Sequence, residues 1–424
     1  MPFFWAYEYM GLASKLSRKI LSFKAVVGIV GVGYVGESLA LATSNAGFKT
    51  NGFEIDKTKI EKINKLKHKN LKATDDKKLL ASCDIICICV PTPTYKDNTP
   101  NLEYLTIAAK EIGKYLQNGQ LIVLESSVAP GTTRNIVAPI LREAANERKA
   151  DFFVAFSPER IDPGNTKYGI SITPKVVSGL DEESKQLTIE FYSKFVKQIV
   201  PVSTLEIAEM TKVFENVFRL VNISLVNELS DFARSLGINM WEVIDAAATK
   251  PYGFLAHYPG PGAGGECIPV LPYYLLDSAK KLKVDLPIVK KASETNHMQP
   301  HKVASHALRV LNGSNSKNGQ RKALIVGVAY KGEVNDIRGS AALAIWEKLE
   351  KEGVSVYYHD PYVEHINGFS SKQLHPEFLS EVDVIIIATA HKNISYDLLV
   401  NCQKPLIDTR NVLREFASPH IHRI

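Results

Sequence analysis

A glycine-rich segment between two apolar runs constrains the fold of this chain most strongly. The residues Gly31-Val32-Gly33-Tyr34-Val35-Gly36 follow a β-rich run at 25–30 and open a segment with helical spacing that ends at Gly47. In a strand–turn–helix unit the first glycine permits a tight turn, and the second lets a pyrophosphate approach the backbone. The third glycine lets helix and strand pack closely, and the helix N-terminus faces the phosphates. The segment therefore predicts a dinucleotide-binding unit.

The acidic residue that such a unit needs lies where the second strand-like run ends. Glu54 stands 23 residues after Gly31 and is placed to accept hydrogen bonds from both ribose hydroxyls. A carboxylate at this position repels a 2′-phosphate, so the sequence favours NAD over NADP as the cofactor. Lys59 lies nearby and weakens that preference slightly.

Strand-like and helix-like runs alternate from Lys24 to about residue 203 and again beyond the polar segment 311–322. Such alternation predicts parallel sheets covered by helices. Residues 204–236 contain neither Gly nor Pro and repeat apolar residues at steps of three and four, which is typical of one long helix. We expect an α/β fold in which a central all-helical region with one long connecting helix joins two Rossmann-like doubly wound domains. The expected ranges are 1–23 for an N-terminal extension, 24–203 for the NAD-binding domain, 204–311 for a helical dimerisation domain and 312–424 for the second Rossmann-like domain.

Charge and hydropathy exclude two classes of protein. The net charge is +6, but +3 of it lies in residues 1–24, so the body of the chain lacks the basic surface of a nucleic-acid-binding protein. No run approaches the ~20 apolar residues that span a bilayer. For residues 1–23, membrane contact is less favoured than a surface helix or a frayed extension.

Cysteines and histidines give no metal-binding pattern. Cys83, Cys87 and Cys89 alternate in one apolar run, which favours a packed core and a reducing cytoplasm over disulfides or metal ligation. His297 and His301 are four residues apart, but Pro300 between them disfavours a shared helix face. The histidines of 419–422 are expected in a loose tail. No metal is predicted.

Two further patterns carry chemistry. Lys212, Asn216 and Arg219 follow a spacing that places them on one helix face. Cys267 comes directly after the glycine-rich loop 258–266, whose backbone can present a thiol in a cleft. A nicotinamide site, a Lys/Asn pair and a nucleophilic thiolate together indicate oxidation of an alcohol to an aldehyde and its capture on sulfur. A second oxidation then gives a thioester, which water hydrolyses.

At this point the sequence resembles the UDP-glucose/GDP-mannose dehydrogenase family from about Lys24 to the end. The matching stretches are GVGYVG (31–36), VPTP (90–93), ESSVAPGTT (125–133), SPERIDPGN (157–165), AEMTKVFENVFR (208–219), PGPGAGGECIP (259–269), GVAYKGEVNDIRGS (327–340), HDPY (359–362) and IDTRN (407–411).

The resemblance implies a role for each matching residue. Cys267 would be the nucleophile, Lys212 with Asn216 would steady the oxyanion through an ordered water, and Glu159 would act as acid and base in thioester hydrolysis. The implied substrate contacts are Arg160, Ile161, Lys212, Asn216, Arg219, Tyr258, Gly264, Tyr330, Lys331 and Arg410. The implied NAD contacts are Gly31, Gly33, Tyr34, Val35, Gly36, Glu54, Lys59, Thr92, Ser127 and Arg338, with Arg338 serving the pyrophosphate. In this family the central helices form a homodimer and the C-terminal domain receives the UDP.

The stretches around SPERIDPGN and PGPGAGG resemble members that act on UDP-N-acetylhexosamines. We therefore expect a UDP-N-acetylglucosamine 6-dehydrogenase in the cytoplasm, with UDP-glucose or UDP-N-acetylmannosamine as the alternative substrate. A β-hydroxyacid dehydrogenase is the competing enzyme class, although it needs neither Cys267 nor the second α/β domain.

The chain departs from the family motif at one position. The family has an Asp four residues after the cysteine, where this chain has Leu271, and Glu266 stands directly before the cysteine. Leucine can neither position water nor polarise a thiol, so we expect slower thioester hydrolysis unless Glu266 substitutes. Ser127 replaces a frequent Thr and keeps the hydroxyl. A catalytically weakened protein that binds NAD or a UDP-sugar stays open as an alternative of another class.

Overall fold

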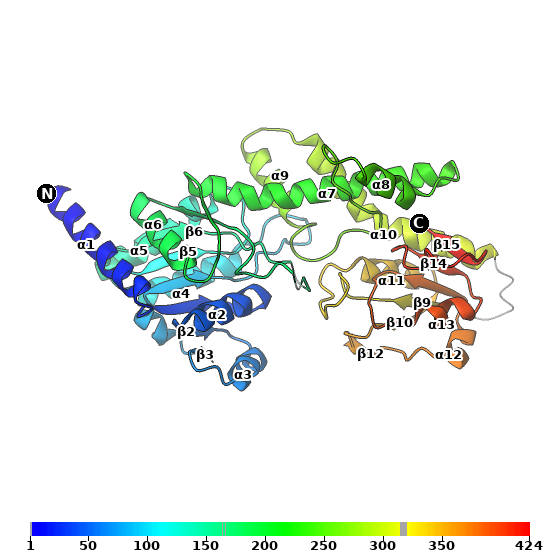
Figure 1. Ribbon diagram of the computed structural model, residues 1–424, viewed down its shortest axis with the longest axis horizontal. Coiled ribbons are helices and arrows are strands. Elements are labelled where there is room, and N and C mark those ends of the chain that lie inside the picture. Colours follow the sequence, from blue (N-terminus) through cyan, green and yellow to red (C-terminus); the bar gives the residue numbers. More distant parts are fainter. Residues whose placement is uncertain (1, 163, 166, 314–319) are drawn as a thin grey trace. The chain divides into compact units, whose positions relative to one another are not determined.

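The computed structural model describes residues 2–162, 164–165, 167–313 and 320–424. These residues form two compact units, Met1–Glu215 with Tyr273–Lys283 and Asn216–Pro272 with Val284–Ile424. Each unit is built around one main β-sheet, and the predicted α/β class is confirmed (Figure 1).

The first unit contains an eight-stranded sheet in the order β3-β2-β1-β4-β5-β6-β7-β8. The first six strands follow the order of a dinucleotide-binding Rossmann sheet. Neighbouring strands are parallel except β6 and β7, which pair antiparallel, so the end of the sheet differs from the parallel arrangement that was predicted. The strands are β1 (Val26–Val30), β2 (Lys49–Phe53), β3 (Leu71–Thr74), β4 (Ile85–Ile88), β5 (Leu121–Leu124), β6 (Phe153–Phe156), β7 (Lys175–Gly179) and β8 (Ile199–Pro201).

Helices cover both faces of this sheet because its central strands are apolar on both sides. One core contains side chains of α1, α2, α3 and α6, and the other contains side chains of α4, α5, the 3₁₀ helix η1 and the start of α7. The bounds are α1 (Pro2–Leu21), α2 (Tyr34–Ala46), α3 (Lys57–Lys65), η1 (Lys77–Ser82), α4 (Glu103–Tyr115), α5 (Ala138–Arg148) preceded by one π-helical turn η2 (Thr133–Val137), and α6 (Glu182–Tyr192).

The expected N-terminal extension is helix α1, and its second half belongs to the core of the first unit. Leu16 and Ile20 are buried among residues of α2 and α6. The ammonium of Lys19 donates to the Asp84 carboxylate at 2.5 Å, which ties α1 to the start of β4.

The long helix that was predicted over 204–236 is confirmed as α7 (Leu205–Ser235) (Figure 1). Shorter helices follow it along the chain: α8 (Met240–Ala248), α9 (Leu271–Lys281) and α10 (Pro287–Gly313). The glycine-rich loop 258–266 that precedes Cys267 lies between α8 and α9.

The second unit contains a parallel five-stranded sheet in the order β10-β9-β13-β14-β15. Helices α10 and α11 cover one face, and α12 and α13 cover the other. The order reverses between β9 and β13, and ligands bind doubly wound sheets at the carboxyl ends of such strands. The remaining elements are β9 (Lys322–Val326), α11 (Ala341–Lys351), β10 (Ser355–His359), β11 (His365–Ile366), β12 (Phe369–Ser370), α12 (Pro376–Glu381), β13 (Val384–Ile387), α13 (Tyr396–Asn401), β14 (Leu406–Asp408) and β15 (Ile421–Arg423).

Two details of the prediction are wrong. The histidine-containing segment 419–422 is not a loose tail, because β15 pairs parallel with β14 and Ile421 is buried in the core. Helix α10 continues through Pro300, and the rings of His297 and His301 lie 5.8 Å apart. Pro300 is buried against Gly262, so tertiary packing outweighs the hydrogen bond that proline cannot make.

Candidate active site

The glycine loop after β1 has the geometry of a dinucleotide cradle. Gly31 has a φ of +89°, a conformation that side chains disfavour, and its amide donates to the Phe53 carbonyl at 2.9 Å. A Cβ on Gly36 would lie 1.9 Å from the Gly31 carbonyl oxygen, so only glycine lets α2 pack this closely. The space beside Gly33 is open, with no heavy atom within 4 Å of a Cβ placed there. These three observations fit a pyrophosphate at the N-terminus of α2.

Glu54 reaches this loop from the end of β2, as predicted. Its Oε2 accepts from the Val32 amide at 3.0 Å, and its Oε1 accepts from the Ile55 amide at 2.9 Å. The ammonium of Lys59 lies 3.9 Å from Oε2. The carboxylate is therefore fixed beside the glycine loop, where a ribose of NAD would bind.

The remaining predicted cofactor residues of the first unit lie on loops that follow strands of the same sheet. The Thr92 hydroxyl, after β4, donates to the Ser127 carbonyl, after β5, at 2.7 Å. Tyr34 and Val35 open α2, and the Tyr34 side chain is half exposed. Because parallel strands end at one edge of the sheet, these loops share an edge with the glycine loop.

The SPER segment follows β6 and holds its glutamate in a fixed orientation. Glu159 is 8% exposed, and its Oε1 accepts from the amides of Arg160 and Ile161 at 2.7 and 2.5 Å. The Arg160 guanidinium donates to the Pro174 carbonyl at 2.8 Å and to Glu215 of α7 at 2.6 Å. Arg160, predicted as a substrate contact, thus ties this segment to α7.

Helix α7 carries Lys212, Asn216 and Arg219 on successive turns; Asn216 is buried and Arg219 is exposed. One turn before Lys212, the fully buried Glu209 accepts from the amides of Gly131 and Thr133 at 2.5 and 2.8 Å and from the Thr133 hydroxyl at 2.7 Å. Burial raises the pKa of Glu209 to about 7, although these hydrogen bonds oppose the shift. Glu209 therefore fixes the loop after β5 to α7.

In the second unit, buried amide side chains hold the glycine-rich loop that ends at Cys267. Asn227 of α7 accepts from the Gly260 amide at 2.8 Å, and Gln299 of α10 donates to the Gly260 carbonyl at 3.1 Å. Asn296 accepts from the amide of Ala263 at 2.7 Å and donates to its carbonyl at 3.0 Å. Every one of these three amides is buried. They pin the loop backbone to two helices.

Close contacts explain the glycines of this loop. A Cβ on Gly264 would lie 2.7 Å from the Gly339 carbonyl oxygen, and one on Gly265 would lie 3.0 Å from the Tyr330 ring. A Cβ on Gly260 would meet the Arg410 guanidinium at 2.9 Å, and Arg410 donates to the Ala388 carbonyl at 2.8 Å. Three predicted substrate residues, Gly264, Tyr330 and Arg410, therefore lie along this loop. Lys331 follows Tyr330.

A further predicted substrate residue of this region, Tyr258, packs against α8. Its ring stacks on Trp241 with centroids 4.7 Å apart, and its hydroxyl donates to Asp245 at 2.7 Å.

Cys267 is exposed, whereas Cys83, Cys87 and Cys89 are buried as predicted and Cys402 is partly buried. The neighbouring Glu266 forms an ion pair with Arg338, which also donates to Asp336 at 2.6 Å. Arg338 is thus fixed beside the cysteine loop by two carboxylates.

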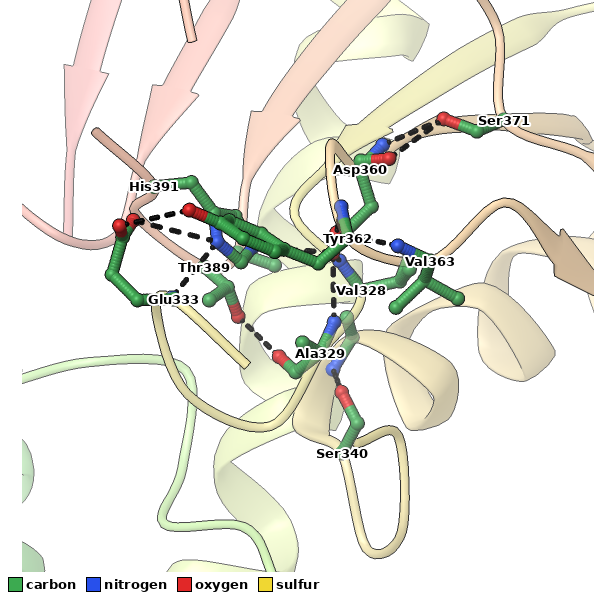
Figure 2. A network of polar contacts seen from close by, with 12 residues as sticks. Val328, Ala329, Glu333, Ser340, Asp360, Tyr362, Val363, Ser371, Thr389 and His391 are labelled. Atoms are coloured by element: carbon green, nitrogen blue, oxygen red, sulfur yellow. Dashed lines mark hydrogen bonds and ion pairs between the residues drawn. The ribbon is translucent and has the colours of Figure 1, made fainter. Parts of the chain in front are cut away.

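A buried polar network supports the loop that carries Tyr330, Lys331 and Arg338 (Figure 2). Asp360, after β10, accepts from the amides of Val328 and Ala329 at 2.7 and 3.0 Å. The His391 Nε2 lies 3.2 Å from Asp360, and its Nδ1 accepts from the Glu333 amide at 3.1 Å. Asp360 holds its βα loop as Glu54 does in the first unit. In this loop of the second unit, Ala329 occupies the position of the second glycine of the GxGxxG motif. The loop is therefore not a second copy of the dinucleotide cradle.

Sequence reasoning missed the residues that hold these loops. Glu209, Asn227, Asn296 and Gln299 interrupt the apolar faces of long helices, and a buried polar residue at such a position is the signal that points to them. Their partners are backbone groups far along the chain, which spacing alone does not reveal.

Two further findings concern membranes and metals. Among the helices that the structure describes, none is both long and apolar enough to cross a membrane. Within the described residues, no three His, Cys, Asp or Glu side chains gather as metal ligands would.

A Rossmann sheet with a dinucleotide cradle in one unit and a second doubly wound sheet in the other define a nucleotide-dependent dehydrogenase. The chain belongs to the UDP-glucose/GDP-mannose dehydrogenase family, whose NAD binding, central and UDP binding domains match residues 64–196, 206–298 and 324–415. It is an NAD-dependent UDP-sugar 6-dehydrogenase.

Individual relatives agree with this assignment. The chain is 31% identical to the UDP-N-acetyl-D-mannosamine dehydrogenase of Pyrococcus horikoshii over 92% of its own length and 96% of that protein. It is 30% identical to the UDP-N-acetyl-D-glucosamine 6-dehydrogenase of Pseudomonas aeruginosa over 86% and 90% of the two chains. The solved structure of the P. horikoshii protein aligns with a TM-score of 0.84 at 30% identity, covering 94% of this chain and 99% of that one.

Proposed function

We propose that this protein oxidises C6 of a UDP-N-acetylhexosamine to the carboxylate through a covalent intermediate on Cys267. The observation that carries the proposal is an exposed thiol at the end of a backbone loop that buried amides pin in place. The N-acetylated sugar is supported by the relatives named above, which act on UDP-N-acetylmannosamine and UDP-N-acetylglucosamine.

Bound NAD⁺ would accept one hydride in each of two oxidations. The Cys267 thiolate adds to the C6 aldehyde that the first oxidation leaves, and the second oxidation turns this adduct into a thioester. Lys212 and Asn216 stabilise the negative charge on the C6 oxygen. Glu159 accepts a proton from water as the water attacks the thioester, and the Cys267 sulfur leaves as the thiolate.

Each unit supplies a different part of this chemistry. The loop around Gly31 and Glu54 binds and orients the cofactor, and Arg338 interacts with its pyrophosphate. Tyr330, Lys331 and Arg410 contact the UDP-sugar, as do Arg160, Ile161, Arg219, Tyr258 and Gly264. Most of the cofactor residues fall in the expected range 24–203, with Arg338 in 312–424, whereas the substrate residues come from all three ranges, 24–203, 204–311 and 312–424.

The protein forms a homodimer through α7. Exposed apolar side chains follow one another along this helix, and Phe214 and Phe232 are 61% and 63% exposed. The other members of the series are Ile207, Met210, Phe218, Leu225 and Leu229. An apolar stripe of this length indicates a protein interface. The double variant Phe214→Asp/Phe232→Asp should be monomeric in light scattering, whereas Ile107→Asp, at an exposed position of α4, should stay dimeric.

The substrate preference of the enzyme tests the proposal that its substrate is a UDP-N-acetylhexosamine. Rates of NADH formation are measured with UDP-glucose, UDP-N-acetylglucosamine, UDP-N-acetylgalactosamine and UDP-N-acetylmannosamine. Each product is identified by mass spectrometry. We expect kcat/KM for one N-acetylated sugar to exceed that for UDP-glucose at least about 100-fold, since an unfilled site for the acetamido group leaves buried polar groups unpaired. Equal or better use of UDP-glucose would contradict the proposal.

A further inference from the structure

A buried cluster of charged and polar side chains lies behind Glu159 in the first unit. Lys175 opens β7, Glu125 follows β5, and Tyr192 ends α6. The side chains of Lys175 and Glu125 are 5% and 0% exposed, and Tyr192 is fully buried. Such groups are rarely buried without a partner, so their arrangement needs an explanation.

The Lys175 ammonium is fixed from several sides. It donates to Glu125 Oε2 at 2.6 Å and to the Pro158 carbonyl at 3.4 Å, and it lies 4.8 Å from the centroid of the Tyr192 ring. The Tyr192 hydroxyl donates to the other oxygen of Glu125. Glu125 and Tyr192 thus determine where the positive charge sits.

The same ammonium lies 3.7 Å from Glu159 Oε2. Backbone amides hold the other oxygen of Glu159, whereas Oε2 is buried and accepts no hydrogen bond from the described residues. One lysine therefore faces two carboxylates, and Glu125 alone would be enough to neutralise it. The second contact leaves Glu159 with a fixed cation beside its unbonded oxygen.

The direction of the Lys175 pKa shift agrees with this arrangement. Burial alone would lower the pKa of Lys175, but Glu125 and Glu159 outweigh it and raise that pKa. Burial raises the pKa of Glu125, and it raises the pKa of the Cys87 and Cys89 thiols well above their usual range, so both thiols stay neutral.

Tyr34, which opens α2, lies close enough to Glu159 and to Asp162 for their charges to act on its hydroxyl. Burial raises the pKa of Tyr34, which keeps its hydroxyl neutral. Lys175 is therefore the cation that the described residues of β4, β5, β7 and α6 present to Glu159.

We propose that Lys175 is a positioning residue that holds a fixed positive charge beside Glu159 and orients its carboxylate to take a proton from water, and that Glu125 sets how much of the lysine charge Glu159 receives. The inference rests on the proposed role of Glu159 in thioester hydrolysis. It adds Lys175, Glu125 and Tyr192 to the residues on which the reaction depends, although none of them touches the substrate.

The pH dependence of kcat separates this role from a purely structural ion pair. The double variant Lys175→Met/Glu125→Gln removes both the cation and the charge of Glu125. The acidic limb of the kcat–pH profile, where kcat falls as the pH is lowered, should therefore move up by about one to three pH units. In Glu125→Gln the lysine faces Glu159 alone, so the limb should move down. Lys175→Arg should restore it to within about half a unit of wild type. A purely structural ion pair would not shift the acidic limb in opposite directions in Glu125→Gln and in the double variant when both are folded.

The controls decide between the possible failures. Lys185→Met breaks a partly exposed pair with Glu182 and should leave the limb in place. Glu159→Gln should abolish thioester hydrolysis; full activity of that variant would overturn the proposed function itself. If Glu159→Gln is inactive while the limb is unchanged in folded Glu125→Gln and in the double variant, only the role of Lys175 is overturned.

Discussion

The backbone amide of Leu271 donates a hydrogen bond to the carbonyl of Cys267 at 3.0 Å, and the Leu271 side chain is 1% exposed. Leucine thus stands one helical turn from the nucleophile, where the family motif has an aspartate. The nearby carboxylate of Glu266 forms an ion pair with Arg338. The Leu271 side chain is therefore apolar and cannot act as a base towards the thiol.

Restoring the carboxylate should speed the reaction. We expect Leu271→Asp to raise kcat about tenfold, because general-base assistance contributes at least that much. The variant should also lose about 1 to 3 kcal/mol of stability, since the new carboxylate is buried. Leu271→Asn is the matched control and should lose stability without a gain in kcat. Equal kcat for Leu271→Asp and wild type would contradict this explanation.

Glu209 should make stability depend on pH. Its pKa is raised to about 7 in the folded protein, so the folded chain holds a proton that the unfolded chain releases. The resulting stabilisation is complete below about pH 4.5 and is lost as the pH rises through about 7.

Glu209→Gln tests this linkage. Between pH 5 and 8 the unfolding free energy of wild type should fall by about 1 to 3 kcal/mol more than that of the variant. Urea unfolding at both pH values measures the difference, with Glu206→Gln, a partly exposed neighbour that pairs with Arg134, as the control. Parallel pH dependence in wild type and Glu209→Gln would show that the folded state does not favour the protonated form.

The architecture was largely predictable because the apolar patterns are long. The 31 residues of α7 and the strand β1 with its glycine loop follow directly from periodicity and from the turn chemistry of Gly31. Short elements were not predictable. Strand β15 has three residues, too few for a period, and it forms because β14 offers a free edge.

The site was predictable in part, and for a similar reason. Glu54 follows its motif at a fixed spacing, so its place beside Val32 could be expected. The contacts of Lys175 could not, because Glu125 and Glu159 lie 50 and 16 positions away along the chain. Only the fold brings such distant charges together.

The glycine at 265 should be irreplaceable. It has a φ of +87°, and a Cβ would lie 3.0 Å from the Tyr330 ring. Gly265→Ala should displace either Tyr330 or the cysteine loop and lower kcat/KM at least about tenfold. Gly353→Ala has similar backbone strain, with a φ of +77°, but meets open space and should keep full activity. Similar activity in both variants would show that the loop tolerates a side chain.

Helix α1 should stabilise the first unit. Ile20 is 0% exposed and its neighbour Leu21 is 53% exposed, so the pair separates core packing from a surface effect. Ile20→Ala should cost about 2 to 5 kcal/mol of unfolding free energy, and Leu21→Ala less than about 0.5 kcal/mol. Urea denaturation checks both values. A loss below about 1 kcal/mol for Ile20→Ala would mean that α1 is not part of the core.

The number of NADH molecules formed for each UDP-sugar consumed tests the central claim most directly. With the preferred N-acetylated sugar, wild type should form two NADH and a uronic acid, because the aldehyde is held on Cys267 until it is oxidised again. Cys267→Ala should form at most one NADH and no uronic acid. One NADH and a free aldehyde from wild type, or two NADH and a uronic acid from Cys267→Ala, would contradict the account.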